Sequence, residues 1–432
     1  MSQTWKKTYN DTPLVYPAST EEVSKVLKIC HAKRIPITGY SGGTSLEGHY
    51  TPTHGGISVN FSRMDKVLAV HHQDLDVVVQ PAVQWQKLNE DLAKDNLFFP
   101  PDPGPGAMIG GMVGTGCSGT NAYRYGTMRD WVLNLTVVLA DGTIIKTRRR
   151  PRKSSAGYNL TQLFIGSEGT LGLVTEATLK LATLPESTSV AVCSFGTVRQ
   201  AADCVASIVG RGLQLAAIEL LDDNQMEYLN HFVGESGVKR NEAPTLFLKF
   251  GGTPDAVKEQ VKIVEKLASK AGSLSFDFAG DKKQEADLWS SRRDALWATM
   301  SVMKEGDKVL TSDVAVPISR LPDAIEQAKA HMMALGLVGS IVGHAGDGNF
   351  HTIVVYSDEQ RAQAEDFLHT MVDRALEMEG TCTGEHGVGL GKRDAVVKEL
   401  GEDTVAAMRR LAFDPLCLLN CDKIFKSQKG DI

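Results

Sequence analysis

Two histidines seven residues apart are the side chains best suited to chemistry in this chain. His344 and His351 bracket three glycines, an Asp and an Asn in VGHAGDGNFHTIVV, residues 342–355. The glycines disfavour a helix, so the pattern predicts a strand, a turn and a second strand, with both imidazoles around the turn. Such a segment could belong to a metal site, a phosphate-binding turn, or a hairpin that merely contains histidines.

A second segment, GTCTGEHGVGLGK at residues 380–392, adds a carboxylate and a third imidazole. Glu385 and His386 stand there between glycines, after a predicted helix. Two imidazoles and one carboxylate satisfy a divalent ion such as Zn²⁺ or Mn²⁺ and leave positions open for a substrate. Taken singly, a histidine is more often a core or surface imidazole, and a Glu-His pair among glycines is more often a solvated loop.

Length and composition describe a soluble globular protein of two or three domains. The chain has 432 residues, 42% apolar and 23% charged, with a net charge of −6 that gives no reason to expect nucleic acid as a partner. Seven cysteines without CxxC spacing favour reduced thiols. The longest uncharged stretch, residues 103–123, contains seven glycines and two prolines, which argues against a transmembrane span. The N-terminal MSQTWKKTYN carries no targeting pattern, so we expect a targeting segment to be absent or removed.

The chain divides into two regions with different patterns of predicted helices and strands. Residues 20–34 predict a helix, and VLNLTVVLADGTIIKT at residues 132–147 predicts a hairpin with an Asp-Gly turn. Beyond a boundary near Pro185, strands and helices alternate as in an α+β domain. The basic run RRRPRK, residues 148–153, fits a solvated hairpin better than a docking patch.

Three glycine-rich loops lie in the first half of the chain, at residues 36–48, 100–130 and 166–172. Consecutive glycines let backbone N–H groups turn inward as an anion-binding nest, and neighbouring hydroxyls add donors. The first loop is neither a Walker loop nor a Rossmann turn, and by itself it could be an ordinary loop. Three such loops within ~140 residues indicate backbone that lies against a large ligand.

The order of these motifs resembles a known family. GYSGGTSLEG, PPDPG, IGGMVGTGCSG, YGTMRD and GSEGTLGLVTEATLKL resemble the FAD-binding domain of the vanillyl-alcohol oxidase superfamily. The second half is similar to the D-lactate dehydrogenase (cytochrome) and D-2-hydroxyglutarate dehydrogenase branch. The resemblance implies an α+β protein: a two-part FAD-binding domain of the PCMH type at 1–185, an α+β substrate (cap) domain with a large antiparallel sheet at 186–410 that carries the metal site, and a segment at 411–432 that returns to the flavin domain.

The resemblance also assigns cofactor contacts. The first loop should hold the pyrophosphate, the second should lie near the flavin and along the cofactor, and the third should approach the adenine end. Because no histidine stands within GYSGGT, noncovalent FAD is expected. The assigned residues are Gly39, Tyr40, Ser41, Gly42, Gly43, Thr44, Ser45, Gly48, Pro101, Asp102, Gly110, Gly111, Thr115, Ser118, Gly119, Glu168, Gly169, Gly172, Val174 and, in the C-terminal segment, Asn420.

For the chemistry, the resemblance implies His344, His351 and Glu385 as ligands of Zn or Mn and His386 as the base. Asp347 is expected to orient a ligand imidazole, and Asn349 to touch flavin or substrate. A substrate carboxylate needs a cation, and alignment on Trp289 favours Arg292 over Arg293; otherwise these are surface arginines of an amphipathic helix.

The expected substrate is inferred from a position at which this chain differs from some members of the family. Relatives that act on 2-hydroxyglutarate carry a Lys shortly before Asp313, where this chain has Thr311 and Ser312, which favours D-lactate oxidised to pyruvate. The alternatives are a D-2-hydroxyglutarate dehydrogenase, a glycolate-oxidising subunit, or, in a different class, a non-redox or inert FAD-binding subunit.

Cytochrome c is the implied electron acceptor, with quinone or electron-transfer flavoprotein as alternatives. A mitochondrial location is expected, otherwise a cytoplasmic one. Cys421 replaces the family's Pro near the C-terminus, while Asn420 and Lys423 remain.

Overall fold

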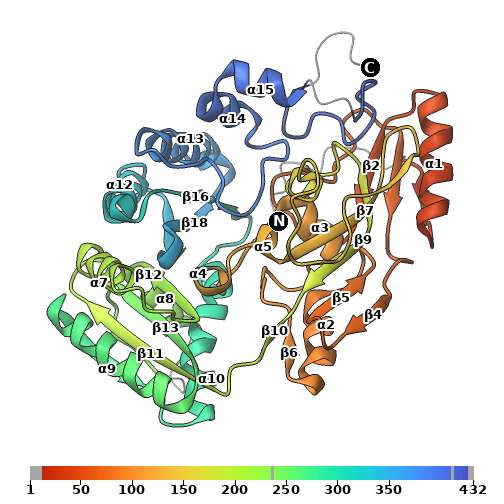
Figure 1. Cartoon of the computed structure of the whole chain (residues 1–432). Coiled ribbons are helices and arrows are strands. Elements are labelled where there is room, and N and C mark those ends of the chain that lie inside the picture. Colours follow the sequence, from red (N-terminus) through yellow and green to blue (C-terminus); the bar gives the residue numbers. More distant parts are fainter. Residues whose placement is uncertain (1–11, 235–237, 410–412, 427–432) are drawn as a thin grey trace. The chain divides into compact units, whose positions relative to one another are not determined.

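The computed structural model describes residues 12–234, 238–409 and 413–426 (Figure 1). Its contacts divide them into two compact units. The large-sheet unit comprises residues 120–124 and 185–384. The glycine-loop unit comprises residues 12–119, 125–184, 385–409 and 413–426. All seven cysteines are free thiols.

The large-sheet unit is built on one antiparallel sheet of eight strands. The strand order is β14-β11-β13-β12-β17-β18-β15, with β16 also paired to β18. This confirms the predicted large antiparallel sheet and the α+β class. The strands are β11 (Ser187–Phe195), β12 (Ala217–Leu221), β13 (Thr245–Gly252), β14 (Ser273–Phe278), β15 (Lys308–Thr311), β16 (Val314–Ala315), β17 (Val338–His344) and β18 (Asn349–Tyr356).

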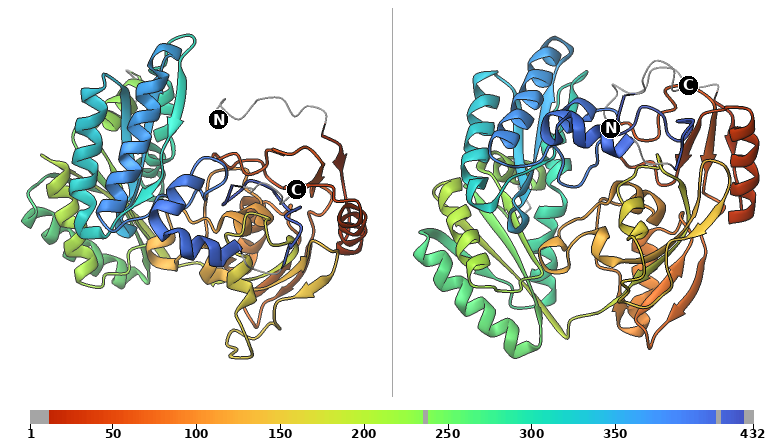
Figure 2. Two further views of the ribbon diagram at one scale, coloured as in Figure 1. Left: turned by 90° about the horizontal axis from the view of Figure 1, so that it is seen from above. Right: turned by 45° about the horizontal axis from the view of Figure 1, so that its top comes forward.

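Both faces of this sheet are covered by helices, because apolar side chains alternate toward each face. In β11, Ala191 and Cys193 belong to one core and Val190 and Val192 to the other. The first core is shared with α7 (Val198–Gly210), α9 (Pro254–Lys270), α12 (Leu321–Ala334) and α13 (Arg361–Glu377), of which the last two lie side by side in Figures 1 and 2. The second core is shared with α8 (Asp223–Val233), α10 (Lys282–Arg293) and α11 (Ala295–Met300).

Asp222 is a fully buried carboxylate at the junction of β12 and α8. Its Oδ1 accepts the backbone N–H of Gln225 at 2.9 Å, as the N-cap of α8, and that of Ile341 at 3.1 Å. Lys329 Nζ lies 3.5 Å from Oδ2. Burial nevertheless raises the pKa of Asp222 to about 6, because desolvation of the charged form outweighs Lys329 and the two N–H donors.

Replacing Asp222 with Asn is expected to stabilise the protein at neutral pH. The folded state holds the proton up to a higher pH than the unfolded state, so the free energy of unfolding falls as pH rises from about 4 to about 6. The charged form at pH 7 therefore costs up to ~3 kcal/mol. D222N should lose this pH dependence and should melt at a higher temperature than the unaltered protein at pH 7. Thermal melts of both proteins at about pH 4 and at pH 7 measure the effect. A lower melting temperature for D222N at pH 7 would mean that the Lys329 pair outweighs burial.

The glycine-loop unit contains a five-stranded antiparallel sheet in the order β4-β5-β9-β7-β8. The predicted hairpin is confirmed: β7 (Val132–Val138) and β8 (Ile144–Lys146) pair across a turn in which Gly142 has φ +83°. The other strands of this sheet are β4 (Val67–His71), β5 (Asp76–Val79) and β9 (Leu173–Lys180). A parallel sheet, β1-β3-β2, joins β1 (Leu14–Val15), β3 (Ile57–Asn60) and β2 (Ile37–Tyr40), and β6 (Leu97–Phe98) pairs with β10 (Ala182–Thr183).

Helices of this unit are short apart from the first. The predicted helix near residues 20–34 is α1 (Thr20–Ala32), capped by Ser19, whose hydroxyl accepts from Glu22 N–H. The others are α2 (Trp85–Leu92), α3 (Ile109–Thr115), α5 (Met128–Trp131), α6 (Leu160–Phe164), α14 (Arg393–Leu400) and α15 (Glu402–Arg409), and α4 (Ala122–Tyr125) stands where the chain passes between units. Across the described ranges, no helix combines the length and the hydropathy that a membrane span requires.

From Glu385 onward, the described part of the chain is grouped with the glycine-loop unit. The domain boundary at 410 that the family resemblance implies stays a prediction, and residues 410–412 and 427–432 lie outside the described part. The tail is held by backbone bonds to β2: Ile37 N–H donates to Leu418 O at 2.7 Å, and Asn420 N–H donates to Ile37 O at 2.6 Å.

Candidate active site

His344 and His351 lie on the same face of the large sheet. They end β17 and follow the start of β18, and between them a 3₁₀ turn, η4 (Ala345–Asp347), and Gly348 at φ +71° reverse the chain. This is the strand, turn and strand that the glycines predict. Side-chain alternation directs both imidazoles to the face covered by α8, α10 and α11, together with Val342 and Ile353. Their ring centroids are 5.4 Å apart, and both side chains are at least 90% buried.

Each imidazole is oriented through Nδ1. His344 Nδ1 lies 2.7 Å from Glu219 Oε1, and His351 Nδ1 lies 3.1 Å from the carbonyl oxygen of Ser312. A carboxylate and a carbonyl only accept, so each ring donates a proton from Nδ1, and in the neutral ring the lone pair is then on Nε2. This arrangement, in which a second acceptor fixes the ring, is the usual environment of histidines that bind metals. The donor set therefore fits a divalent cation.

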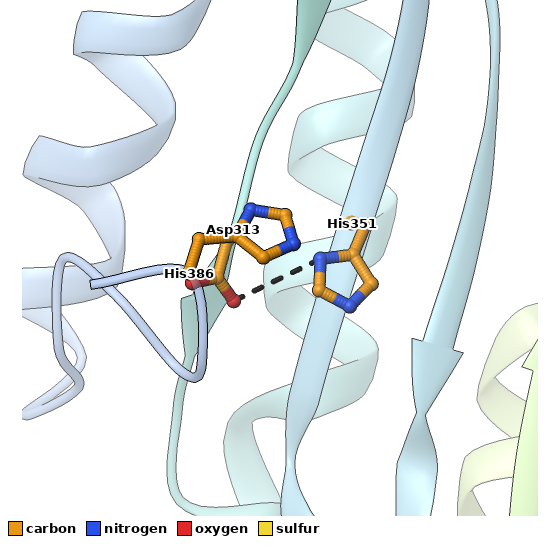
Figure 3. Close-up of side chains that lie close together, drawn as sticks. All are labelled: Asp313, His351 and His386. Atoms are coloured by element: carbon orange, nitrogen blue, oxygen red, sulfur yellow. Dashed lines mark ion pairs between the residues drawn. The ribbon is translucent and has the colours of Figure 1, made fainter. Parts of the chain in front are cut away.

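Asp313 supports the same corner of the sheet from the segment between β15 and β16. Its Oδ1 lies 3.7 Å from His351 Nδ1, the contact drawn in Figure 3, and accepts the Asn349 amide at 2.8 Å. Its Oδ2 accepts Thr383 Oγ1 at 2.7 Å. Asn349, predicted to touch flavin or substrate, donates here to Asp313 and to Val314 O. Its observed contacts therefore join the start of β18 to the start of β16.

Arg292 lies in the last turn of α10, over the same face. Its Nε donates to Glu219 Oε2 at 2.7 Å, and its side chain is 14% exposed, whereas Arg293 is exposed. Glu219 thus links Arg292 to His344. Burial raises the pKa of the Glu219 carboxyl, but His344 and Arg292 together outweigh burial and hold that pKa below its ordinary value. The carboxylate is therefore ionised.

Glu219 was missed by the sequence interpretation. It sits in LAAIELLD, where it is the one charged residue inside an apolar strand, and that contrast was the available signal. Its partner across the sheet is set by register, because Glu219 is directly opposite His344 in the β12–β17 pair. Glu219 contacts His344. The expectation that Asp347 orients an imidazole stays a prediction.

Glu385 and His386 open the final segment of the glycine-loop unit. Glu385 Oε2 accepts the hydroxyl of Ser118 at 2.8 Å. Two and three residues beyond His386, the backbone N–H groups of Val388 and Gly389 donate to the two carboxylate oxygens of Glu168 at 2.6 and 2.8 Å. The turn that carries His386 is therefore fixed by the third glycine loop. Ser118 and Glu168, both assigned to the cofactor from sequence, make these contacts.

The three glycine loops meet in the glycine-loop unit. A Cβ at Gly42 would lie 3.0 Å from Gly106 O, so the first loop packs against the second. Glu168 N–H donates to Gly114 O at 2.9 Å, which joins the second loop to the third. Asn420 Nδ2 donates to Glu168 O at 2.5 Å and brings in the tail. Four segments that are distant in sequence therefore pack together within this unit.

Not every glycine in these loops faces a ligand-sized space. A Cβ at Gly172 would lie 2.5 Å from Val137, and one at Gly110 would lie 2.6 Å from Pro81. These two glycines therefore permit close packing. Gly119, at φ +153°, would place a Cβ 2.5 Å from Asp102 O, so two parts of the second loop approach each other closely there. All the residues assigned to the cofactor lie within this one unit.

Family models identify the class of protein. Residues 12–148 match an FAD binding domain, and residues 184–424 match the C-terminal domain of FAD linked oxidases. The chain belongs to the FAD-linked oxidase family. This confirms the resemblance found in the sequence motifs.

The individual relatives are more specific. The chain is 52% identical to the mitochondrial D-lactate dehydrogenase (cytochrome) of Kluyveromyces lactis, over 97% of this chain and 74% of that protein. It is 47% identical to the mitochondrial D-lactate dehydrogenase (cytochrome) 1 of Saccharomyces cerevisiae, over 100% of this chain and 76% of that protein. Its fold is shared with 4-ethylphenol oxidase from Gulosibacter chungangensis, with a TM-score of 0.78 and 16% identity over 96% of this chain and 89% of the other.

Proposed function

We propose that this protein oxidises a D-2-hydroxy acid, D-lactate to pyruvate, with noncovalent FAD and a divalent cation, Zn²⁺ or Mn²⁺. The observation that carries the proposal is the buried group formed by His344, His351 and Arg292 on one sheet face. It combines two cation ligands with a guanidinium suited to a carboxylate. Relatives at 47% to 52% identity, named D-lactate dehydrogenase (cytochrome), support the same substrate.

Glu385 is proposed as the third ligand. Gly384, the last residue of the large-sheet unit, has no room for a side chain: a Cβ there would overlap the Asn349 amide and lie 2.9 Å from Asp313 Oδ1. The next Cα along a trans peptide is about 3.8 Å away. Chain continuity therefore supports a glutamate and a base close to the histidine pair.

The residues divide the work as follows. Arg292 binds the substrate carboxylate, and His344, His351 and Glu385 hold the cation. Bound FAD would supply the acceptor for the Cα hydrogen and its two electrons, and a cation held by the three ligands would supply polarisation of the hydroxyl oxygen. His386 removes the hydroxyl proton as the carbonyl forms, so that charge is balanced at the same oxygen. The cofactor contacts assigned to the three glycine loops remain part of this proposal.

Selectivity for a small monocarboxylate rests on the strand before Asp313. Ser312 is buried, and its hydroxyl accepts from Thr352 N–H at 2.8 Å and Thr352 Oγ1 at 2.9 Å. Neither Thr311 nor Ser312 supplies a cation for a second carboxylate. D-2-hydroxyglutarate is therefore expected to be a poorer substrate. Cytochrome c is proposed as the acceptor and the mitochondrion as the location, in line with the names of the relatives.

The test is a spectrum of the FAD-loaded protein mixed with D-lactate under anaerobic conditions. We expect the oxidised flavin to bleach and pyruvate to form in an equal amount, with far slower bleaching by D-2-hydroxyglutarate and glycolate. Addition of oxidised cytochrome c should then restore the flavin spectrum, and a quinone or electron-transfer flavoprotein serves as comparison. A flavin that stays oxidised with every hydroxy acid would overturn the proposal and favour a non-redox role.

A further inference from the structure

We propose that Glu219 is a positioning residue that sets cation affinity and substrate binding together, by fixing His344 and Arg292 with its two carboxylate oxygens. The inference rests on the proposed function, since it gives Glu219 a part in that reaction. It goes beyond that function because it predicts that two separate properties, the affinity for the cation and the KM for the hydroxy acid, depend on one residue that is expected to touch neither.

The geometry leaves Glu219 little freedom. It lies opposite His344 in the β12–β17 ladder, and its side chain is 1% exposed. Each oxygen has its own partner at 2.7 Å, His344 Nδ1 on Oε1 and Arg292 Nε on Oε2. Charge-assisted bonds between buried groups are strong and directional. The distance between the imidazole and the guanidinium is therefore set by the width of one carboxylate.

Each contact has a chemical consequence for its partner. A carboxylate at Nδ1 keeps the His344 proton on that nitrogen, so the lone pair of Nε2 is presented to a cation. A carboxylate at Arg292 Nε fixes the guanidinium plane through its inner nitrogen, so the two terminal nitrogens form the fork that matches a substrate carboxylate. A neutral amide at position 219 cannot accept from both partners at once.

A simpler role would be charge balance, in which Glu219 only neutralises Arg292 inside the sheet. Two substitutions separate the roles. Glu219→Gln keeps the shape and removes the charge, and one end of its amide becomes a donor that faces His344 or Arg292. Glu219→Asp keeps the charge but is one methylene shorter, so it cannot span both partners. The matched control is Asp222→Asn, another buried carboxylate three residues along the chain that binds backbone N–H groups.

Three measurements are made on the FAD-loaded protein and its variants. Chelator competition gives the affinity for Zn²⁺ and Mn²⁺, steady-state assays at saturating cation give KM and kcat for D-lactate, and thermal melts report folding. We expect Glu219→Gln and Glu219→Asp each to weaken cation binding by about 10- to 100-fold. At least one of them should also raise KM for D-lactate by about tenfold or more with a smaller change in kcat. Asp222→Asn should match the unaltered protein in both properties.

A fourth measurement needs neither a variant nor turnover. Long-range ¹H–¹⁵N spectra of the cation-free protein, labelled at histidine, should show His344 with its proton on Nδ1. A proton on Nε2 would overturn the inference. So would a Glu219→Asp variant with unaltered cation affinity and KM, since charge alone would then suffice. If the unaltered protein fails to oxidise D-lactate, but the Glu219 variants still lose cation affinity and His344 keeps its proton on Nδ1, it is the proposed function that fails.

Discussion

Replacing His386 with alanine is expected to slow flavin reduction by D-lactate by about 10²- to 10⁴-fold, the usual contribution of a positioned general base. The turn that carries His386 is fixed through Val388 and Gly389, whose N–H groups bind Glu168, so the imidazole can be removed while the turn is kept. FAD should stay bound at the same stoichiometry. Stopped-flow absorbance of the flavin after anaerobic mixing with D-lactate measures the effect.

The matched control for this loss is His72→Ala, an exposed histidine of the same unit with a side chain 55% accessible. It should reduce at the unaltered rate. Rates for His386→Ala within a few-fold of the unaltered protein would remove His386 from the proton transfer. Loss of FAD together with activity would instead show that His386 supports the cofactor, and Glu168→Gln, which weakens the same turn, should then release FAD too.

Removing the cation is expected to abolish activity to a similar degree. His344 and His351 are each held at Nδ1, so each truncation deletes one of the proposed ligands. Loss of an outer partner of such a ligand already costs about 10- to 100-fold in affinity. We expect His344→Ala and His351→Ala to be purified with little Zn or Mn, measured by elemental analysis. The chelated unaltered protein should regain D-lactate oxidation when either metal returns.

The control here is His331→Ala. His331 belongs to α12 of the same unit and packs against Phe367, with ring centroids 5.7 Å apart. It should change thermal stability but not metal content. Full activity after rigorous removal of metal would contradict the ligand assignment. A His344→Ala variant that keeps its metal but has lost activity would place His344 at the substrate instead.

Local patterns were the most predictable part of the fold. The Asp-Gly turn between β7 and β8 and the glycine-bearing turn between β17 and β18 each follow from a few adjacent residues. The large antiparallel sheet followed from alternating helix and strand patterns together with the family resemblance. These features depend on residues that are adjacent in sequence, and the structure agrees with the prediction at both turns and in the large sheet.

The contacts that organise the candidate site were less predictable, because they join residues far apart in sequence. Glu219 and His344 are 125 positions apart and Ser118 and Glu385 are 267 apart, and neither pairing is visible in the motif of either partner. The glycine loops were predicted as a group, but density of glycine cannot separate residues that approach a ligand from those, such as Gly172, that approach a core valine. Whether all three proposed ligands meet around one cation stays a prediction.

The hydrogen bonds of Glu168 have a consequence for the folding of the chain during synthesis. Its carboxylate and its carbonyl hold partners 220 to 252 positions later in the chain, on the turn after His386 and at Asn420. During synthesis the earlier loops leave the ribosome long before these partners exist, and domains generally settle as units in the order they emerge. The imidazole of His386, the proposed base, is therefore expected to be fixed in place only near the end of translation. Nascent chains are therefore expected to have no oxidase activity until the contacts of Glu168 with the turn and with Asn420 form, even if FAD is already bound.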